Sequence, residues 1–181
     1  AHLAGLAARE GIATAVERRR RAEEDWAEAW KAHFHPVRVS DRLVVRPTWR
    51  EYRPREGERV ILLDPGMAFG TGTHPTTQAT LRLMERHLTP GQRFLDVGTG
   101  SGILMIGAAL LGAAVVHGVD HDETAVAVAR ENLRRNGIPP ERWAVHRGHL
   151  TDGAEGAYDL VAANILADVV IALLTDVGRV M

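Results

Sequence analysis

The sequence predicts an α/β fold in which helices cover both faces of a doubly wound, mostly parallel β-sheet. From residue 93 onward, short apolar segments alternate with amphipathic ones, as expected where each strand is followed by a helix. The mostly apolar run 94–97 leads into glycines at positions 98, 100 and 102, and a helical pattern begins at Ile103. Because glycine lets a ligand approach the backbone, such a strand–turn–helix unit is typical of a ligand-binding loop.

The composition excludes several classes of protein. The chain is 45% hydrophobic and 25% charged with a formal net charge of -1, which predicts a globular domain without direct binding to nucleic acid. It has no cysteine, so disulfides and thiolate metal sites are excluded. No apolar run approaches the roughly 20 residues of a membrane span, and the first thirty residues lack the apolar core of a signal peptide. We therefore expect a cytoplasmic protein with no membrane partner.

The amino-terminal segment is expected to contain a short strand and then a helix. The strand is predicted over 12–20, and the charged run 17–21 is interpreted as its solvated end, because acidic residues follow directly. Trp26, Trp30 and Phe34 recur every four residues, which predicts one apolar stripe on a helix that joins two domains.

A hairpin, a loop and a strand are expected next, before a second glycine-rich loop. The segment 36–47 has the alternation and the central Ser-Asp of a hairpin, 48–58 has loop breakers, and 60–63 is an apolar strand. The loop 64–77 contains three glycines and four threonines, and its second proline, Pro75, starts a helix predicted over 75–87. A long loop of this composition is often functional, although a plain connector is the alternative.

An acidic residue at the end of the next strand indicates a nucleotide-like ligand. The strand pattern 115–119 ends at Asp120, which lies 22 residues after Gly98. In a β-α-β nucleotide-binding unit, an acid at about this spacing accepts hydrogen bonds from ribose hydroxyls. The alternative is that Asp120 caps the following helix, but Asp122 is better placed for that role.

Two more strands complete the predicted sheet. They are expected at 143–145 and 158–163, and the second ends at Asn164 before a helix over 165–177. Because the carboxyl ends of parallel strands meet at one edge of a sheet, we expect this asparagine beside the glycine turn and the acid.

These features resemble the class I S-adenosylmethionine-dependent methyltransferases, whose first and second motifs are similar to residues 96–102 and 118–120. One family is more similar still, the bacterial ribosomal protein L-eleven methyltransferases. The segments that carry this resemblance are 24–26, 66–77, 96–104 and 163–166. The loop that reads Phe-Gly-Thr-Gly-Thr-His-Pro-Thr-Thr is the most specific of them, because generic methyltransferases lack it.

The resemblance implies a Rossmann-like class I methyltransferase fold with its carboxyl-terminal strands missing. Residues 1–22 would be the remnant of an amino-terminal substrate-recognition domain, 23–35 the interdomain helix, and 36–181 an incomplete S-adenosylmethionine-binding domain. The sequence is therefore expected to be cut at both ends. The outer edge of the fourth strand would then be unpaired, which is an aggregation liability.

The resemblance also implies the cofactor, S-adenosyl-L-methionine, and residues that bind it. The family's cofactor contacts match four positions of this sequence: Thr77, Gly98, Asp120 and Asn164. We add three glycine-loop residues as cofactor-binding candidates, namely Gly100, Phe69 and Gly70.

The implied reaction is methyl transfer to amines of the eleventh large-subunit ribosomal protein, at lysine side chains or the terminal α-amine. The full-length protein is expected to be a monomer. Asn164 is the candidate that orients the amine, as an acceptor and not as a base. The alternatives are that it caps the next helix or only touches the cofactor. Two roles are possible for His74, a contact with the substrate or a helix cap. Two roles are also possible for Asp96, orienting the glycine turn or approaching the cofactor's amino group.

Two other functions are weighed against this one. A methyltransferase for another amine, or for glutamine, is disfavoured because Asn164 is followed by Ile-Leu-Ala, without the aromatic residue that would stack on a flat base. A nucleotide-binding module without activity is disfavoured because the turn reads Gly-x-Gly-x-Gly and not Gly-x-Gly-x-x-Gly, although a fragment could still bind cofactor. No metal is expected, because the histidines with loose metal-like spacing lack clustered carboxylates and are interpreted as surface residues: His117, His121, His146 and His149.

Overall fold

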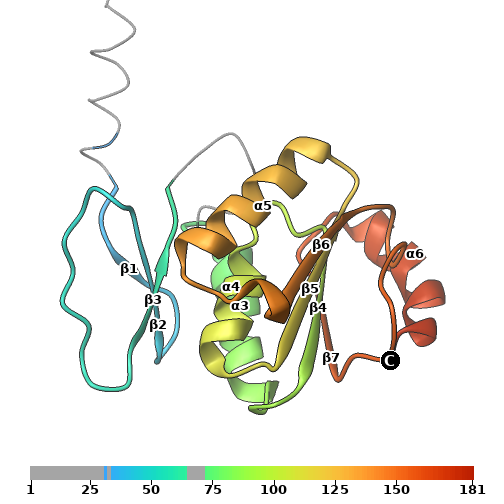
Figure 1. Cartoon of the computed structure of the whole chain (residues 1–181), viewed down its shortest axis with the longest axis horizontal. Helices are drawn as coiled ribbons and strands as arrows, with labels where there is room; N and C mark the ends of the chain where they lie inside the picture. Colours follow the sequence, from blue (N-terminus) through green and yellow to red (C-terminus); the bar gives the residue numbers. More distant parts are fainter. Residues whose placement is uncertain (1–30, 32–33, 65–71) are drawn as a thin grey trace, which may run out of the picture. The chain divides into compact units, whose positions relative to one another are not determined.

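The computed structural model describes residue 31 and residues 34–64 and 72–181 (Figure 1). It divides into two units, Ala1–Phe34 and His35–Met181. The expected remnant 1–22 and most of the expected interdomain helix 23–35 lie outside the described residues, as do Phe69 and Gly70. The domain boundaries drawn from the sequence therefore stay predictions, and the second unit is described below.

The elements of the second unit follow the predicted order. In chain order they are β1 (Val37–Arg38), β2 (Leu43–Arg46), β3 (Arg59–Leu62), α3 (Pro75–His87), β4 (Arg93–Val97), α4 (Ile103–Leu111), β5 (Val115–Asp120), α5 (Glu123–Arg135), β6 (Trp143–Arg147), β7 (Leu160–Ala163) and α6 (Ala167–Asp176). Two short 3-10 turns, Pro140–Arg142 and Val177–Arg179, precede β6 and follow α6.

The larger sheet has the strand order β6-β5-β4-β7, and all its strands are parallel. Val97, the last residue of β4, pairs with Val119 of β5 and with Ala163 of β7, so the three strands end at the same level. The glycine turn, the acid and the asparagine singled out in the sequence come immediately after these paired residues. Their predicted position at one edge of a parallel sheet is confirmed.

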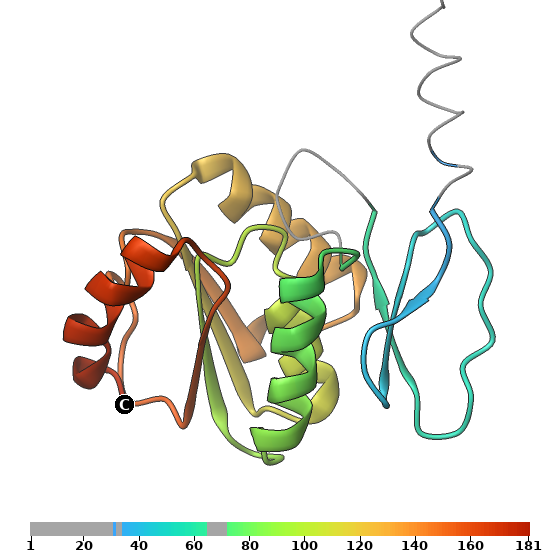
Figure 2. The same cartoon turned by 180° about the vertical axis from the view of Figure 1, so that it is seen from behind.

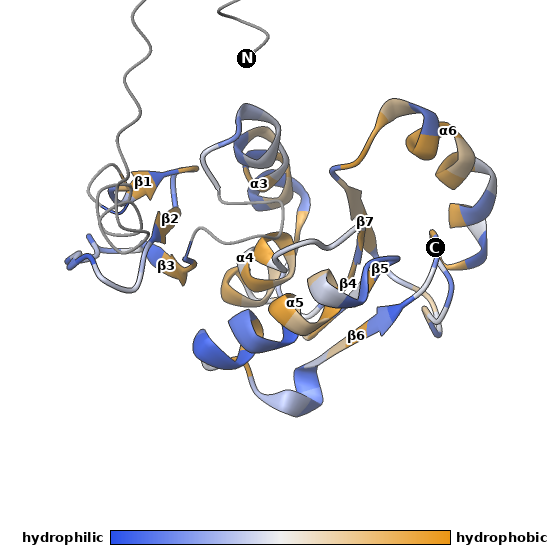
Figure 3. Cartoon of the chain, turned by 90° about the horizontal axis from the view of Figure 1, so that it is seen from above, coloured by the Kyte–Doolittle hydropathy of each residue, from blue (hydrophilic) through white to orange (hydrophobic). Residues whose placement is uncertain are grey.

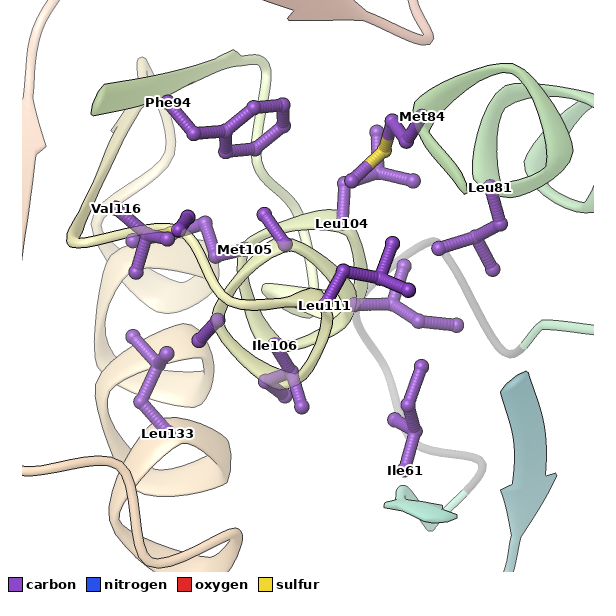
Figure 4. Close-up of a cluster of buried hydrophobic side chains, with 14 of the residues drawn as sticks. Ile61, Leu81, Met84, Phe94, Leu104, Met105, Ile106, Leu111, Val116 and Leu133 are labelled. Atoms are coloured by element: carbon purple, nitrogen blue, oxygen red, sulfur yellow. The ribbon is translucent and has the colours of Figure 1, made fainter. Parts of the chain in front are cut away.

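Helices cover both faces of this sheet, as the sequence predicts. Helices α3, α4 and α5 lie on one face and α6 lies on the other (Figure 3). The main hydrophobic core joins Phe94 of β4 to Leu104 of the almost fully buried α4 and to Leu81 of α3 (Figure 4). A smaller cluster on the opposite face joins Leu95 of β4 to Leu173 of α6.

A second sheet has three strands in the order β1-β2-β3. β1 and β2 form the predicted antiparallel hairpin, in which Val37 lies opposite Val45. β3 pairs with β2 in parallel, a pairing that no local pattern of the sequence reveals. Leu43 and Ile61 of this sheet are fully buried in the same core as α3 and α4, so the second sheet extends the main hydrophobic core.

The helix ends carry the predicted capping residues. His74 is the N-cap of α3, where its Nδ1 accepts a hydrogen bond from the N–H of Thr76 at 3.3 Å, which supports the cap role among its two open roles. Asp122 caps α5 by accepting the N–H of Thr124 at 2.8 Å. Gly112 ends α4 with a φ of 107°, which glycine adopts readily.

Several boundaries differ from the predictions by one or two residues: β3 spans Arg59–Leu62 and not 60–63, and β6 extends to Arg147 and not only to 145. β7 begins at Leu160 and not at 158, because the N–H of Tyr158 donates to the carbonyl of Val180 and not to a neighbouring strand. α6 begins at Ala167, after the extended residue Leu166. Figure 2 shows α6 and the carboxyl terminus close together, on the face of the sheet opposite to α3, α4 and α5.

β7 forms one edge of the larger sheet. Among the described residues, no strand pairs with that edge, as the sequence predicts for the fourth strand. In the part of the chain that the structure describes, no helix has both the length and the apolar character needed to cross a membrane.

Candidate functional site

A cavity of about 400 Å³ lies at the carboxyl ends of β4 and β5. Gly98 and Asp120, two residues singled out in the sequence, line it together with Ile165 and Leu166, which precede α6. Leu150, from the loop after β6, joins Ile165 and Leu166 in an apolar wall of the cavity. Its φ is 51°, a left-handed conformation that is uncommon for leucine. The volume is typical of a small-molecule site, and apolar walls beside one buried carboxylate suit a ligand with a flat apolar part and hydroxyl groups.

The glycine turn has the backbone that its sequence predicts. Gly98, Gly100 and Gly102 have φ angles of 74°, 53° and 79°, in the region that favours glycine. A Cβ atom on Gly98 would lie 2.3 Å from Cγ2 of Ile165, so a side chain at this position would clash with the cavity wall. The N–H of Gly98 donates to the carbonyl of Val119 at 2.8 Å, which ties the turn to β5.

Backbone groups hold the carboxylate of Asp120 in place. Its Oδ2 accepts the N–H of Gly100 at 2.8 Å, and its Oδ1 accepts the N–H of Asp122 at 3.0 Å. The residue is only 7% exposed and lines the cavity. Because a carboxylate has about four lone-pair positions, it can still accept hydrogen bonds from a ligand. Asp122 caps α5, so the alternative role of Asp120 as the helix cap is excluded.

Thr77 and Asn164 contact each other, although 87 positions separate them in the chain. The Nδ2 of Asn164 donates to Oγ1 of Thr77 at 3.1 Å. Thr77 is fully buried in the first turn of α3, and Asn164 is half-buried in the connection between β7 and α6. The N-cap of α6 is Leu166, so the alternative that Asn164 caps this helix is wrong. Asn164 directly precedes Ile165 of the cavity wall, which places the pair beside the cavity.

Asp96 is a buried acid behind the glycine turn. Its Oδ2 accepts the hydroxyl of Thr99 at 2.8 Å, so it orients the turn, which is one of its two open roles. Its Oδ1 is buried without a hydrogen-bond partner among the described residues. The pKa of Asp96 is raised to about 7, chiefly by burial; the Thr99 hydrogen bond opposes this rise, and the negative charge of nearby Asp120 adds to it.

Because the pKa of Asp96 is raised, we expect the free energy of unfolding to depend on pH. The variant Asp96→Asn should lose this contribution to the pH dependence. Between pH 4 and pH 7 the folded protein keeps a proton on Asp96 that the unfolded chain has lost, so the free energy of unfolding falls as the pH rises. This one group changes the free energy of unfolding by up to about 1.4 kcal/mol per pH unit. Urea unfolding of both proteins at pH 5, 6 and 7 should show a shallower pH dependence for the variant, whereas parallel curves would refute the prediction.

The four histidines set aside as surface residues differ in their surroundings. His121 and His149 are exposed at the cavity. His117 and His146 are half-buried, and Nδ1 of His117 lies 2.5 Å from Oη of Tyr158, so the interpretation of these two histidines as surface residues is wrong. Burial lowers the pKa of His117, and the positive charge of Arg93 lowers it further. The described residues contain no group of three or more His, Asp or Glu side chains that could hold a metal ion.

Comparisons with a family model and with curated sequences identify the same family. The family model for ribosomal protein L11 methyltransferase matches residues 4–181. A ribosomal protein L11 methyltransferase from Desulfosudis oleivorans is 54% identical over 179 residues, which cover 98% of this chain and 59% of the relative. Another from Symbiobacterium thermophilum is 56% identical over 156 residues, which cover 86% of this chain and 50% of the relative. The chain therefore spans little more than half the length of these curated relatives.

A solved structure is similar over most of both chains. The crystal structure of a ribosomal protein L11 methylase from Lactobacillus delbrueckii subsp. bulgaricus matches with a TM-score of 0.74 and 37% sequence identity. The match covers 80% of this chain and 74% of that chain. The predicted Rossmann-like class I methyltransferase fold is thereby confirmed.

Proposed function

Because the chain belongs to the ribosomal protein L11 methyltransferase family, we propose that it binds S-adenosyl-L-methionine and methylates amine nitrogens of ribosomal protein L11. The observation that carries this proposal is the cavity at the strand ends, which Gly98 and the buried carboxylate of Asp120 both line. We further propose a cytoplasmic location, because the proposed substrate is a ribosomal protein.

The cavity suits the chemistry of this cofactor. Asp120 would accept hydrogen bonds from the ribose hydroxyls, because two backbone N–H groups already fix its carboxylate at the cavity wall. Ile165, Leu166 and Leu150 supply apolar surface for the adenine ring. Gly98 has no side chain, so Ile165 of the cavity wall can pack against the glycine turn. When bound, S-adenosyl-L-methionine supplies an electrophilic methyl group on a positively charged sulfur.

The attacking amine must be neutral, because a protonated amine has no lone pair. At pH 7, removing the proton from a lysine of pKa about 10.4 costs about 4.6 kcal/mol, whereas an α-amine costs about 1 kcal/mol. Apolar surroundings lower the pKa of an amine, because they disfavour its charged form. A desolvated position for the amine beside Asn164 would therefore offset part of this cost for lysine.

Asn164 would orient this amine. Its Nδ2 donates to Thr77, and its Oδ1 can accept an N–H of the amine, which directs the nitrogen lone pair away from the amide. An amide is not a base at neutral pH, so the amine proton leaves to solvent. The contribution of Asn164 is therefore positional, and positioning can lower a barrier by up to roughly 7–11 kcal/mol in favourable cases.

The test is transfer of labelled methyl groups. The protein is incubated with methyl-labelled S-adenosyl-L-methionine and purified ribosomal protein L11, and label and mass of the substrate are followed. We expect labelled L11 with mass increments of one methyl group, and no label on L11 whose amines have been acetylated beforehand. Tight cofactor binding without label on L11, or label on the acetylated substrate, would overturn the proposal.

A further inference from the structure

We propose that Thr151 and Asp176 are positioning residues for cofactor binding, because the hydrogen bond between their side chains holds Leu150 in the wall of the cavity. The hydroxyl of Thr151 donates to Oδ2 of Asp176 across 25 positions of the chain. Neither residue lines the cavity itself, so both act through the wall and not by touching the cofactor. This inference rests on the proposed function, since the wall matters only if the cofactor occupies the cavity.

The hydrogen bond joins two of the segments that supply the apolar cavity wall. Leu150 comes from the loop after β6, and the second segment is the beginning of α6 with the connection before it. Thr151 directly follows Leu150, and Asp176 is the last residue of α6. Leu173 of the same helix is buried in the smaller hydrophobic cluster, which holds α6 on the sheet. The hydrogen bond therefore ties the loop to a helix that is itself held in place.

The backbone of Leu150 needs support from such a contact. Among the described residues, it is the only one other than glycine with a positive φ. A side chain in this left-handed region costs energy, and the conformation persists only where surrounding contacts hold it. The N–H of His149 donates to Oδ2 of Asp152 at 3.2 Å, and the N–H of Asp152 donates to the carbonyl of His149 at 3.0 Å. Leu150 therefore lies in a closed turn, which Thr151 attaches to α6.

The chemistry of the two groups fixes the direction of this hydrogen bond. An ionised carboxylate only accepts hydrogen bonds, so the hydroxyl of Thr151 is the donor. This hydrogen bond lowers the pKa of Asp176, against the effect of partial burial, and the charge of Arg179, whose Nη1 lies 3.0 Å from Oδ1, lowers it further. Thr151 is 7% exposed and the Asp176 side chain 16%, so water has little access to the bond. Hydrogen bonds to a charged group are also the stronger kind.

The experiment compares Thr151→Val, which keeps the shape and removes the hydroxyl, with Thr151→Ser, which keeps the hydroxyl. For Thr151→Val we expect the Kd for S-adenosyl-L-methionine to rise about tenfold, as for the loss of one hydrogen bond to a charged group. The Kd for adenosine should rise by the same factor, because Leu150 belongs to the wall proposed for the adenine ring. Thr151→Ser should keep both Kd values within threefold of the unmodified protein. Isothermal titration calorimetry measures each of them.

Two variants in α6 test the other end of the hydrogen bond. Asp176→Ala removes the same bond, so it should raise both Kd values about as much as Thr151→Val, and it carries the test should the valine variant not fold. Thr175→Val is the matched control. Its position precedes Asp176, and the hydroxyl of Thr175 donates to the carbonyl of Ala172 in the same helix at 2.7 Å. This control should keep both Kd values within twofold.

A double-mutant cycle tests the route of the effect. If Thr151 acts through Leu150, Thr151→Val should raise the cofactor Kd less than twofold in a protein that already carries Leu150→Ala. Unchanged Kd values in both Thr151→Val and Asp176→Ala would overturn the inference. A rise of the same size with and without the Leu150 side chain would overturn it too, because the effect would then not pass through the wall. Failure of the unmodified protein to bind S-adenosyl-L-methionine would instead overturn the proposed function itself.

Discussion

Asn164→Ala is expected to lower kcat for methylation of L11 about 100-fold, while the Kd for S-adenosyl-L-methionine changes less than threefold. The reason is that the variant loses the oxygen that would accept from the amine, and misplacing a reacting group by about 1 Å can cost about 100-fold in rate. The cavity walls that would hold the cofactor, Gly98 and Asp120 among them, are untouched by this change. Steady-state kinetics with L11 as the varied substrate, together with calorimetry for the cofactor, separate the two effects.

A second substitution at the same position provides the control. Asn164→Asp keeps an oxygen acceptor, so it should retain more activity than Asn164→Ala. Its negative charge stabilises the protonated amine, however, and raises the amine pKa. The pH–rate profile of Asn164→Asp should therefore move to higher pH. An Asn164→Ala variant with kcat within threefold of the unmodified protein would show that this residue does not orient the amine.

The second large effect is expected at Asp120. Asp120→Ala should weaken binding of S-adenosyl-L-methionine by about 1.5–3 kcal/mol, as for the loss of hydrogen bonds to a charged group. Part of the loss would come from the glycine turn, because the N–H of Gly100 loses its acceptor in this variant. Isothermal titration calorimetry measures the change directly.

Asp122→Ala is the matched control for this second prediction. Asp122 is exposed, and its side chain caps α5 through the N–H of Thr124. Its loss should lower the free energy of unfolding by about 1 kcal/mol and leave the cofactor Kd nearly unchanged. Equal affinities for the unmodified protein and Asp120→Ala, in preparations that do bind the cofactor, would remove Asp120 from the binding site.

Much of this fold could be predicted because its signals are local. Pro75, Asp122 and Gly112 each act within one turn of the helix that they begin or end, so the sequence around them is sufficient. The glycine turn and Asp120 belong to a single β-α-β unit, whose parallel register brings both to one edge of the sheet. The same argument placed Asn164 at that edge, because β7 pairs in parallel with β4.

The features that the sequence did not reveal depend on residues far apart in the chain. The parallel pairing of β3 with β2 leaves no local pattern. The partner of His117 is Tyr158, 41 positions away, and the partner of Asn164 is Thr77, 87 positions away. The apolar wall formed by Leu150 and Ile165 comes from two connections, where no periodicity marks a side chain as facing a ligand.

A crystal structure of the protein with S-adenosyl-L-homocysteine, the demethylated product, tests the central claim most directly. The claim is that the cavity at the ends of β4 and β5 is the cofactor site. It predicts the product in this cavity, with a ribose hydroxyl within hydrogen-bond distance of Asp120 and the adenine ring against Ile165. A product molecule bound elsewhere, or one whose ribose makes no contact with Asp120, would contradict it.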